Sequence, residues 1–260
     1  MTSQNRNGQS SRVSVPIYES IGVGYSSTRR PDPRIAQQIR SALGDVASVI
    51  NVGAGAGSYE PTDCAVVAVE PSPTMIRQRD GAGPPVVQAV AEDLPFADGR
   101  FDGAMAVLTV HHWRDIPRGL DELHRVTRGP IVVMTWDNDV HAEQWLIEEY
   151  LPAMLELDTQ CPSPFEIGDA LGGASIHPVD VPADCTDGFC HAWWCRPEAY
   201  LDSNVRAGIS GIARLSEDYV DAAMQRLARD LTSGEWRDRH GELLTLASHD
   251  AGYRLVVADS

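Results

Sequence analysis

Short apolar runs recur along the first half of the chain. They occupy residues 49–52, 65–69, 85–90, 103–108 and 131–136. The run at 65–69, AVVAV, is apolar throughout, as expected for a parallel strand that is buried on both faces. Before the first run, Ile35, Ile39 and Leu43 recur at four-residue spacing, which predicts an amphipathic helix.

Segments that predict helices separate some of these runs. Residues 73–79 have room for about two helical turns. Between the fourth and fifth runs, Asp115 can cap a helix that has Pro117 in its first turn. Gly129-Pro130 can end that helix. Strands that alternate with helices predict an α/β fold with a parallel sheet and right-handed crossovers.

The rhythm breaks beyond the fifth run. Residues 142–157 have a helical pattern, and 176–182 predict a sixth strand. Residues 197–246 are mainly helical in pattern, with Ser216 as a possible helix cap. Residues 253–258, YRLVVA, predict a last strand. The second half of the chain is therefore expected to add a helical region to the sheet.

The length of the chain suits one α/β domain, alone or with an inserted cap. Residues 1–14 are rich in Ser, Asn, Gln and Gly, which predicts a disordered tail. We expect residues 15–260 to form a single domain with its core at 45–136. The cap and the substrate-side insertions are expected at 137–175 and 185–246.

The composition excludes several classes of function. The chain has 260 residues, a formal net charge of −16 and no lysine. An acidic surface repels phosphate backbones, so we expect no nucleic-acid substrate. A P-loop and a Schiff base both need lysine, so neither is expected. The polar start of the sequence and the lack of a long apolar run predict a cytoplasmic protein that does not enter a membrane.

A glycine-rich segment follows the first predicted strand. Gly53, Gly55 and Gly57 can adopt positive φ and let a ligand approach the backbone closely. Glu70 follows the second strand directly. In a doubly wound sheet the ends of these two strands lie side by side at the ligand crevice. A carboxylate there can accept hydrogen bonds from both hydroxyls of an adenosine ribose.

Two details favour a cofactor without phosphate. Ser58 stands where the dinucleotide fingerprint has a third glycine or alanine. Only 12 residues, 53–64, separate the two strands, and Glu60 and Pro61 lie among them. The first crossover helix is therefore about one turn long or absent, whereas a pyrophosphate binder depends on that helix. S-adenosylmethionine has no phosphate and carries a sulfonium cation, so the loop suits it better.

Residues 49–136 resemble the core of the class I S-adenosylmethionine-dependent methyltransferases, in the group called methyltransferase type 11. NVGAGAG is similar to the family's first motif, with Asn51 where the family usually has Asp. VAVEPS, AEDLPF and FDGAMAVLTVHHW resemble the next motifs in order. The resemblance implies S-adenosylmethionine as cofactor. It also implies a doubly wound, mostly parallel seven-stranded sheet, Rossmann-like, with an antiparallel last strand and a helical cap.

The same resemblance implies which residues contact the cofactor. Glu70 would bind the ribose. Glu92, with Asp93 as the alternative, would lie near the adenine amine beside the small Ala91. Tyr18, Tyr25, Arg29 or Arg30 of a lid would meet the amino-acid end. The implied set is Tyr25, Arg30, Asn51, Gly53, Ala54, Gly55, Gly57, Glu70, Pro71, Met75, Ala91, Glu92, Asp93 and Leu108.

Three residues are candidates for proton transfer. His111 and His112 lie at the exit of the fourth strand, where sites in open α/β sheets form. A histidine there can take a proton from a hydroxyl or an amine near neutral pH, although a turn with one core histidine is the alternative. Asp187 is the second candidate, provided that the sixth strand is parallel. Its surroundings can also be a capped, hydrogen-bonded turn.

The cysteines do not predict a metal site. Cys185, Cys190 and Cys195 are spaced unlike common zinc pairs, with His177 and His191 nearby. The chain has five cysteines, and an odd number favours buried apolar thiols. No metal is therefore expected.

These observations together predict a methyltransferase that acts on an oxygen or nitrogen atom of a small molecule. A carbon acceptor stays open, and a specialised metabolite is expected from the family alone. One alternative is a non-catalytic binding or regulatory protein with the same fold, which Asn51 leaves open. Another is a nicotinamide-dependent oxidoreductase, against which the missing lysine weighs. We expect a monomer or a homodimer.

Overall fold

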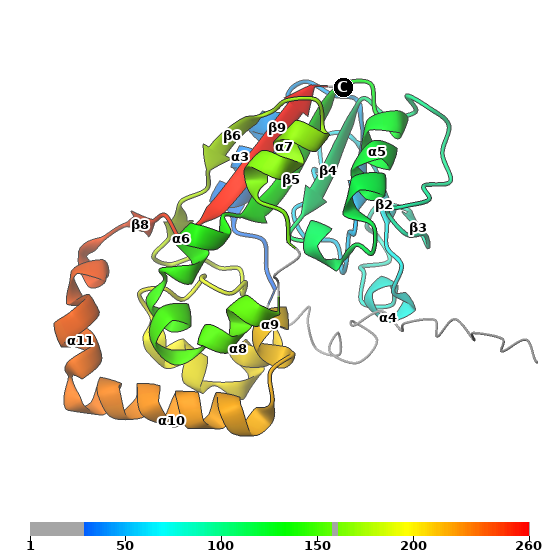
Figure 1. Cartoon of the computed structure of the whole chain (residues 1–260). Helices are drawn as coiled ribbons and strands as arrows, with labels where there is room; N and C mark the ends of the chain where they lie inside the picture. Colours follow the sequence, from blue (N-terminus) through cyan, green and yellow to red (C-terminus); the bar gives the residue numbers. More distant parts are fainter. Residues whose placement is uncertain (1–28, 158–160, 260) are drawn as a thin grey trace, which may run out of the picture.

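The computed structural model describes residues 29–157 and 161–259, and it confirms the predicted α/β fold (Figure 1). A seven-stranded sheet has the strand order β3-β2-β1-β4-β5-β9-β6. The first five strands are parallel, and β9 is antiparallel to both of its neighbours. The strands are β1 (Ser48–Val52), β2 (Ala65–Val69), β3 (Val86–Val87), β4 (Gly103–Val107), β5 (Pro130–Trp136), β6 (Ser175–Pro178) and β9 (Tyr253–Asp259).

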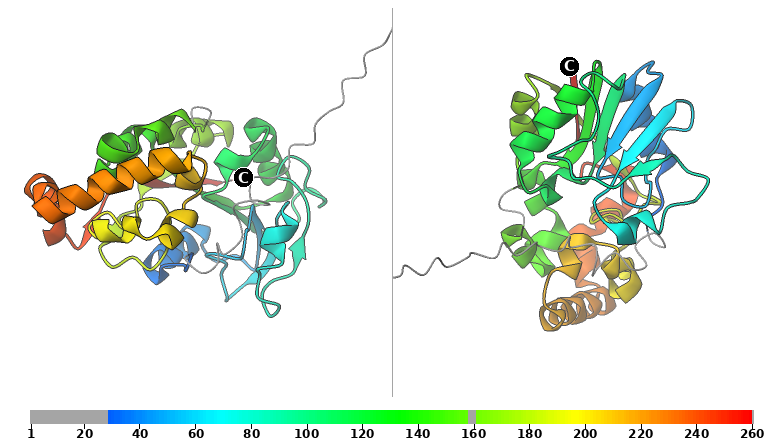
Figure 2. Two further views of the ribbon diagram at one scale, coloured as in Figure 1. Left: turned by 90° about the horizontal axis from the view of Figure 1, so that it is seen from below. Right: turned by 90° about the vertical axis from the view of Figure 1, so that its right-hand side faces the viewer.

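Helices cover both faces of this sheet (Figures 1 and 2). Helix α3 (Pro33–Leu43) packs on one face, and α5 (Ile116–Val126) and α7 (Pro164–Ala170) pack on the other. Side chains alternate between the two faces along each strand, so Val132 belongs to the first cluster and Val133 to the second. Burial on both faces explains why the strands are nearly continuous apolar runs.

Much of the second half of the chain forms a cap at the carboxyl ends of the parallel strands, whereas α7, β6 and β9 belong to the sheet and its helix layer (Figure 1). The cap has its own apolar core, in which Trp145, Tyr150, Leu227 and Trp236 are buried. Among the described helices, none combines the length and the apolar character needed to cross a membrane. The helical segments of the cap after β6 are η4 (Pro197–Leu201), α8 (Ser203–Ala207), α9 (Ser210–Ala213), α10 (Glu217–Ser233), α11 (Glu235–His240) and η5 (Gly241–Thr245).

Two predicted elements in the core are shorter than expected. The strand predicted at 85–90 is only β3, an edge strand that pairs with β2 at two positions. The helix predicted at 73–79 is α4 (Pro73–Ile76), which gives way to a turn. Gly81 and Gly83 follow that turn, and glycine favours irregular backbone over a continued helix.

Two predicted elements beyond β5 are divided. The helix expected at 142–157 is instead α6 (Asn138–Ala142), a π-helical turn and a short 3-10 segment. Pro152 is the first residue of the 3-10 segment. Proline has no N–H group, so it cannot donate the hydrogen bond that would continue the preceding π-helical turn. The strand expected at 176–182 is β6 followed by β7 (Val181–Pro182), which pairs with β8 (Ser248–His249).

The direction of β6 decides where the following loop emerges. Strands β5 and β6 are both antiparallel to β9, so β6 runs in the same direction as the parallel strands. The loop that carries Asp187 therefore leaves the sheet on the side of the cap. The predicted tail at 1–14 lies outside the described residues.

Candidate active site

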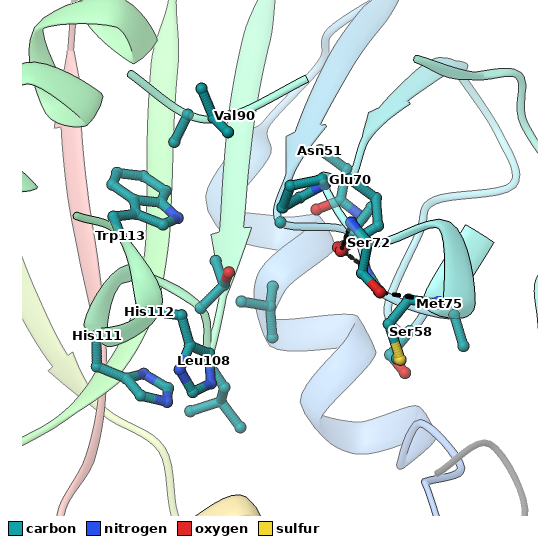
Figure 3. A pocket seen from close by; sticks show the side chains of 18 of the residues that line it. Asn51, Ser58, Glu70, Ser72, Met75, Val90, Leu108, His111, His112 and Trp113 are labelled. Atoms are coloured by element: carbon teal, nitrogen blue, oxygen red, sulfur yellow. Dashed lines mark hydrogen bonds between the residues drawn. The ribbon is translucent and has the colours of Figure 1, made fainter. Parts of the chain in front are cut away.

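A cavity of about 340 Å³ opens at the carboxyl ends of β1, β2 and β4 (Figure 3). In this sheet β1 lies between β2 and β4, which is where the strand order reverses and where ligands bind in open α/β sheets. Loops after all three strands contribute to the wall. Twelve of the residues predicted for the site line it: Asn51, Gly53, Ala54, Gly55, Glu70, Pro71, Met75, Ala91, Glu92, Leu108, His111 and His112.

The remaining predicted residues have other positions. Gly57 and Arg30 lie outside the described lining. Arg29, the alternative to Arg30 for the amino-acid end, does line the cavity, as do Ala56 and Ser58 on either side of Gly57. Asp93 is exposed at the surface and is likewise outside the lining. Tyr18 and Tyr25 lie outside the described residues.

The glycine loop is held tightly against the exit of β4. Gly53 has a φ of +72°, and a Cβ atom there would lie 2.0 Å from Oγ1 of Thr109. The backbone N–H of Gly53 donates to the carbonyl of Val69 at 2.9 Å. Residues 53–64, all of which the structure describes, contain no helix. The loop therefore offers a close backbone approach without the helix N-terminus that a pyrophosphate needs.

Glu70 is fixed at the edge of this loop. Its side chain is buried, and its two carboxylate oxygens accept hydrogen bonds from the N–H groups of Gly55 and Ser72, both at 2.8 Å. Each carboxylate oxygen can accept more than one hydrogen bond, so both keep capacity for ribose hydroxyls. The loop and Glu70 thus fit adenosine attached to a group that carries no phosphate.

Asn51 at the end of β1 contacts a buried ion pair under the loop. Its Nδ2 donates to Oε1 of Glu60 at 3.1 Å, and Arg79 donates to both oxygens of Glu60 at 2.7 and 2.8 Å. The Glu60 and Arg79 side chains are 7% and 6% exposed. Glu60 therefore supplies the carboxylate charge next to a position where the family usually has Asp. The sequence showed an acidic residue in the loop but gave no sign of its partner.

The predicted adenine end has a short apolar wall and one carboxylate. Ala91 is buried, and Val90 and Trp113 line the same part of the cavity (Figure 3). Oε1 of Glu92 accepts hydrogen bonds from the backbone N–H groups of Arg114 at 2.6 Å and Asp115 at 3.2 Å. Glu92 therefore ties the loop after β3 to the exit of β4.

Asp187 forms a buried network that holds Arg29. Its carboxylate is fully buried and accepts four hydrogen bonds: two from Arg29 at 2.7 and 3.3 Å, one from the Tyr59 hydroxyl at 2.7 Å and one from the Gly188 N–H at 2.7 Å. Burial, and then Asp187 itself, raise the pKa of the Tyr59 hydroxyl, which stays protonated. Asp187 lies outside the described lining of the cavity, whereas Arg29 lines it. The geometry suits a residue that positions Arg29 better than a base that meets a substrate.

His111 and His112 stand on a 3-10 turn, η1 (Val110–His112), directly after β4. Their ring centroids are 3.7 Å apart, and both rings line the cavity. Burial, and then the neighbouring His112, lower the pKa of His111 well below its ordinary 6.5. Burial lowers the pKa of His112 to about 4. Both rings are therefore neutral at pH 7 and can accept a proton, although each is a weaker base than a free histidine.

A second cavity of about 60 Å³ adjoins the first. Arg29, Leu108 and His111 line both cavities, so the two meet at these side chains. Leu108 has a φ of +50°, a conformation that is costly for a residue other than glycine. The second cavity is mostly aromatic and apolar. Its wall combines Trp136 of β5 and Tyr253 of β9 with side chains from the cap side, His141, Met154, Phe189, Cys190, Ile209 and Ser210. The sequence predicted a cap over the site but not the residues of this wall, because they come from segments far apart along the chain.

Comparisons with known proteins agree with this geometry. A family model described as a methyltransferase domain matches residues 50–130. A crystal structure of a putative methyltransferase from an antibiotic biosynthesis pathway of Anabaena variabilis ATCC 29413 is 32% identical, with a TM-score of 0.83. That similarity covers 89% of this chain and 98% of the other.

Curated relatives are similar over shorter stretches. The malonyl-[acyl-carrier protein] O-methyltransferase of Pseudescherichia vulneris is 33% identical over 165 residues, which is 54% of this chain and 66% of that protein. The chloroplastic 2-methyl-6-phytyl-1,4-hydroquinone methyltransferase 2 of Oryza sativa subsp. japonica is 28% identical over 127 residues, 40% of this chain and 36% of that protein. The match thus spans 66% and 36% of the lengths of these two curated relatives. The chain belongs to the class I S-adenosylmethionine-dependent methyltransferases, in the type 11 group, and its cofactor is S-adenosylmethionine.

Proposed function

We propose that the protein transfers the methyl group of S-adenosylmethionine to an oxygen or nitrogen atom of a small molecule that enters the second cavity. The meeting of the two cavities at Arg29, Leu108 and His111 carries this proposal. With adenosine held at Glu70, the sulfonium end of the cofactor would face this junction, and an acceptor in the second cavity would lie on the other side of it.

The reaction replaces a bond from sulfur to the methyl carbon with a bond from the acceptor atom to that carbon. The cofactor supplies an activated methyl group, so the protein's contribution is alignment and the exclusion of water. Glu70 and the glycine loop fix the adenosine, and the cap closes the far side. An unprotonated ring nitrogen of His111 takes the proton that a hydroxyl or amine acceptor loses.

The chemistry of the second cavity supports an uncharged acceptor with an aromatic or otherwise apolar body. Trp136, Phe189 and Tyr253 contribute aromatic side chains to its wall. The cation at its edge, Arg29, is paired with Asp187 at 2.7 Å, so no charge on the acceptor is needed to balance it. A formal net charge of −16 disfavours a nucleic-acid acceptor. The similarity to a protein described as part of antibiotic biosynthesis supports a specialised metabolite.

The test is a direct assay of S-adenosylhomocysteine formation. The full chain is incubated with S-adenosylmethionine and a panel of phenols, catechols and aromatic amines, and methylated products are identified by mass spectrometry. We expect turnover with at least one oxygen or nitrogen acceptor. Methylation at carbon alone, or cofactor binding without turnover across the panel, would contradict the proposal and favour a carbon acceptor or a binding protein.

A pair of variants tests the place of the acceptor. Ser210→Phe puts a ring into the second cavity and should remove turnover while S-adenosylmethionine still binds. Ser203→Phe is the matched control, because Ser203 is exposed on α8. Equal turnover by Ser210→Phe and the wild type would rule out this cavity as the acceptor site.

A further inference from the structure

Two histidines and a cysteine meet at the inner end of the second cavity. His141 lies on α6, and Cys190 and His191 lie in the turns that follow Asp187. Each residue has a potential ligand atom within 4.8 Å of the other two. A ring nitrogen of His191 (Nε2) and one of His141 (Nδ1) are 2.9 Å apart and share a hydrogen bond. Neither residue has a role in the methyl transfer described above.

The surroundings favour neutral ligands. His141 and His191 are 8% and 1% exposed. The hydrogen bond between the two rings requires an unprotonated, accepting nitrogen on one of them, and an unprotonated ring nitrogen is the form that binds metals. When both rings bind a metal, the proton of that hydrogen bond must also leave its nitrogen.

The donor set matches a borderline cation such as Zn²⁺. Two imidazoles and a thiolate are ligands that Zn²⁺ takes in catalytic sites with three protein ligands and one open position. A tetrahedral site with usual Zn–N and Zn–S lengths puts its ligand atoms about 3.4–3.6 Å apart. The two ring nitrogens would need to separate by a few tenths of an ångström from 2.9 Å. That change is small for side chains on a turn and a short helix.

The second cavity provides the fourth position. His141 and Cys190 line it, so a metal between them faces the space where the acceptor binds. Zn²⁺ and one thiolate together carry a single positive charge, which in a buried site favours an anionic fourth ligand. Binding releases the thiol proton of Cys190 to solvent.

We propose that His141, Cys190 and His191 form a binding site for Zn²⁺ whose open position faces the second cavity. The spacing of the cysteines along the sequence gave no such signal, because 49 residues separate His141 from Cys190. The fold brings them together by packing α6 against the turns after Gly188. The site shares the second cavity with the proposed acceptor, but the methyl transfer proposed above uses none of its three ligands, so failure of the metal site would leave the methyltransferase proposal intact.

Cobalt spectroscopy tests the site without any turnover. The full chain is stripped with a chelator and titrated with Co²⁺. We expect one Co²⁺ per chain, a near-ultraviolet band from thiolate-to-cobalt charge transfer and visible bands of a tetrahedral site, all displaced by Zn²⁺. Cys190→Ser should lose the charge-transfer band, and both Cys190→Ser and His141→Asn should weaken Zn²⁺ binding at least 100-fold. Cys64→Ser is the matched control, because Cys64 is a partly exposed cysteine directly before β2. This variant should keep the charge-transfer band and the Zn²⁺ affinity of the wild type.

A second measurement uses only the wild type, so it does not depend on whether a variant folds. Zn²⁺ should protect Cys190 of the wild type from iodoacetamide, and peptide mass spectrometry identifies the cysteine that is protected. Absence of the charge-transfer band in the wild type, or equal labelling of Cys190 with and without Zn²⁺, would overturn the proposal. So would Zn²⁺ binding by Cys190→Ser that equals that of the wild type.

Discussion

Replacing the carboxylate of Asp187 with an amide of almost the same shape should destabilise the protein strongly. Asp187→Asn keeps the size of the side chain but removes the carboxylate charge that pairs with the Arg29 guanidinium, which is 9% exposed. The new amide also presents an N–H₂ group where Arg29 and Tyr59 already donate. Breaking a buried ion pair by removing one partner costs about 3–5 kcal/mol. We expect a loss of that size in the free energy of unfolding.

Urea denaturation, monitored by tryptophan fluorescence, measures this loss. Asp184→Asn is the matched control, because Asp184 is 82% exposed and pairs with Arg34 at the surface. An exposed ion pair contributes about 1 kcal/mol or less, so this control should be nearly neutral. The double variant Arg29→Met/Asp187→Asn should be less destabilised than Asp187→Asn alone, because it removes both charges of this buried pair. A loss below about 1 kcal/mol for Asp187→Asn would refute the reasoning about this network.

Three further predictions follow from single residues. Gly53→Ala should weaken S-adenosylmethionine binding at least tenfold in calorimetric titration, because its Cβ would lie 2.0 Å from Thr109 Oγ1; unchanged affinity contradicts the close approach. His111→Asn should lower kcat by about 10²–10⁴-fold without a change in KM for the cofactor. Because the pKa of His111 is well below 6.5, the kcat of the wild type should stay level from pH 8 to pH 6. A fall in kcat centred near pH 6.5 would contradict this role. The hydrogen bond from Arg34 lowers the pKa of buried Asp32 from 3.8 to about 2, so Asp32 should add about 2 kcal/mol of stability above pH 4 that is lost as the pH falls toward 2. In urea denaturation, Asp32→Asn should have a lower free energy of unfolding than the wild type at pH 7, and this difference should shrink below pH 4. A difference that does not depend on pH would contradict the lowered pKa of Asp32.

The core of the fold was predictable because its signals are local. The apolar runs of β1, β2, β4 and β5 and the glycine loop between β1 and β2 each lie within a few consecutive residues. The same holds for Glu70, which follows β2 directly. A doubly wound sheet brings these short segments to one edge in a fixed way, so the position of the cofactor cavity followed from the order of the motifs.

The sequence predicted a cap at 137–175 and 185–246. The packing inside the cap and the wall of the second cavity were not predictable, because they depend on contacts between distant segments. Arg29 and Asp187 are 158 residues apart, and the hydrogen bond between His141 and His191 spans 50. Asp187 looked like a candidate base from its place after a strand, and only its four hydrogen bonds indicate a positioning role. Helix periodicity also failed over 142–157, where Pro152 divides the segment.

The central claim is that the carboxylate of Glu70 holds the ribose hydroxyls of the cofactor. Calorimetric titration of S-adenosylhomocysteine into the wild type and Glu70→Gln tests it, with Glu198→Gln, an exposed glutamate on η4, as the matched control. Hydrogen bonds to a charged group contribute about 1.5–3 kcal/mol each, so Glu70→Gln should bind at least tenfold more weakly while the control binds like the wild type. Equal affinity of Glu70→Gln and the wild type would contradict the account.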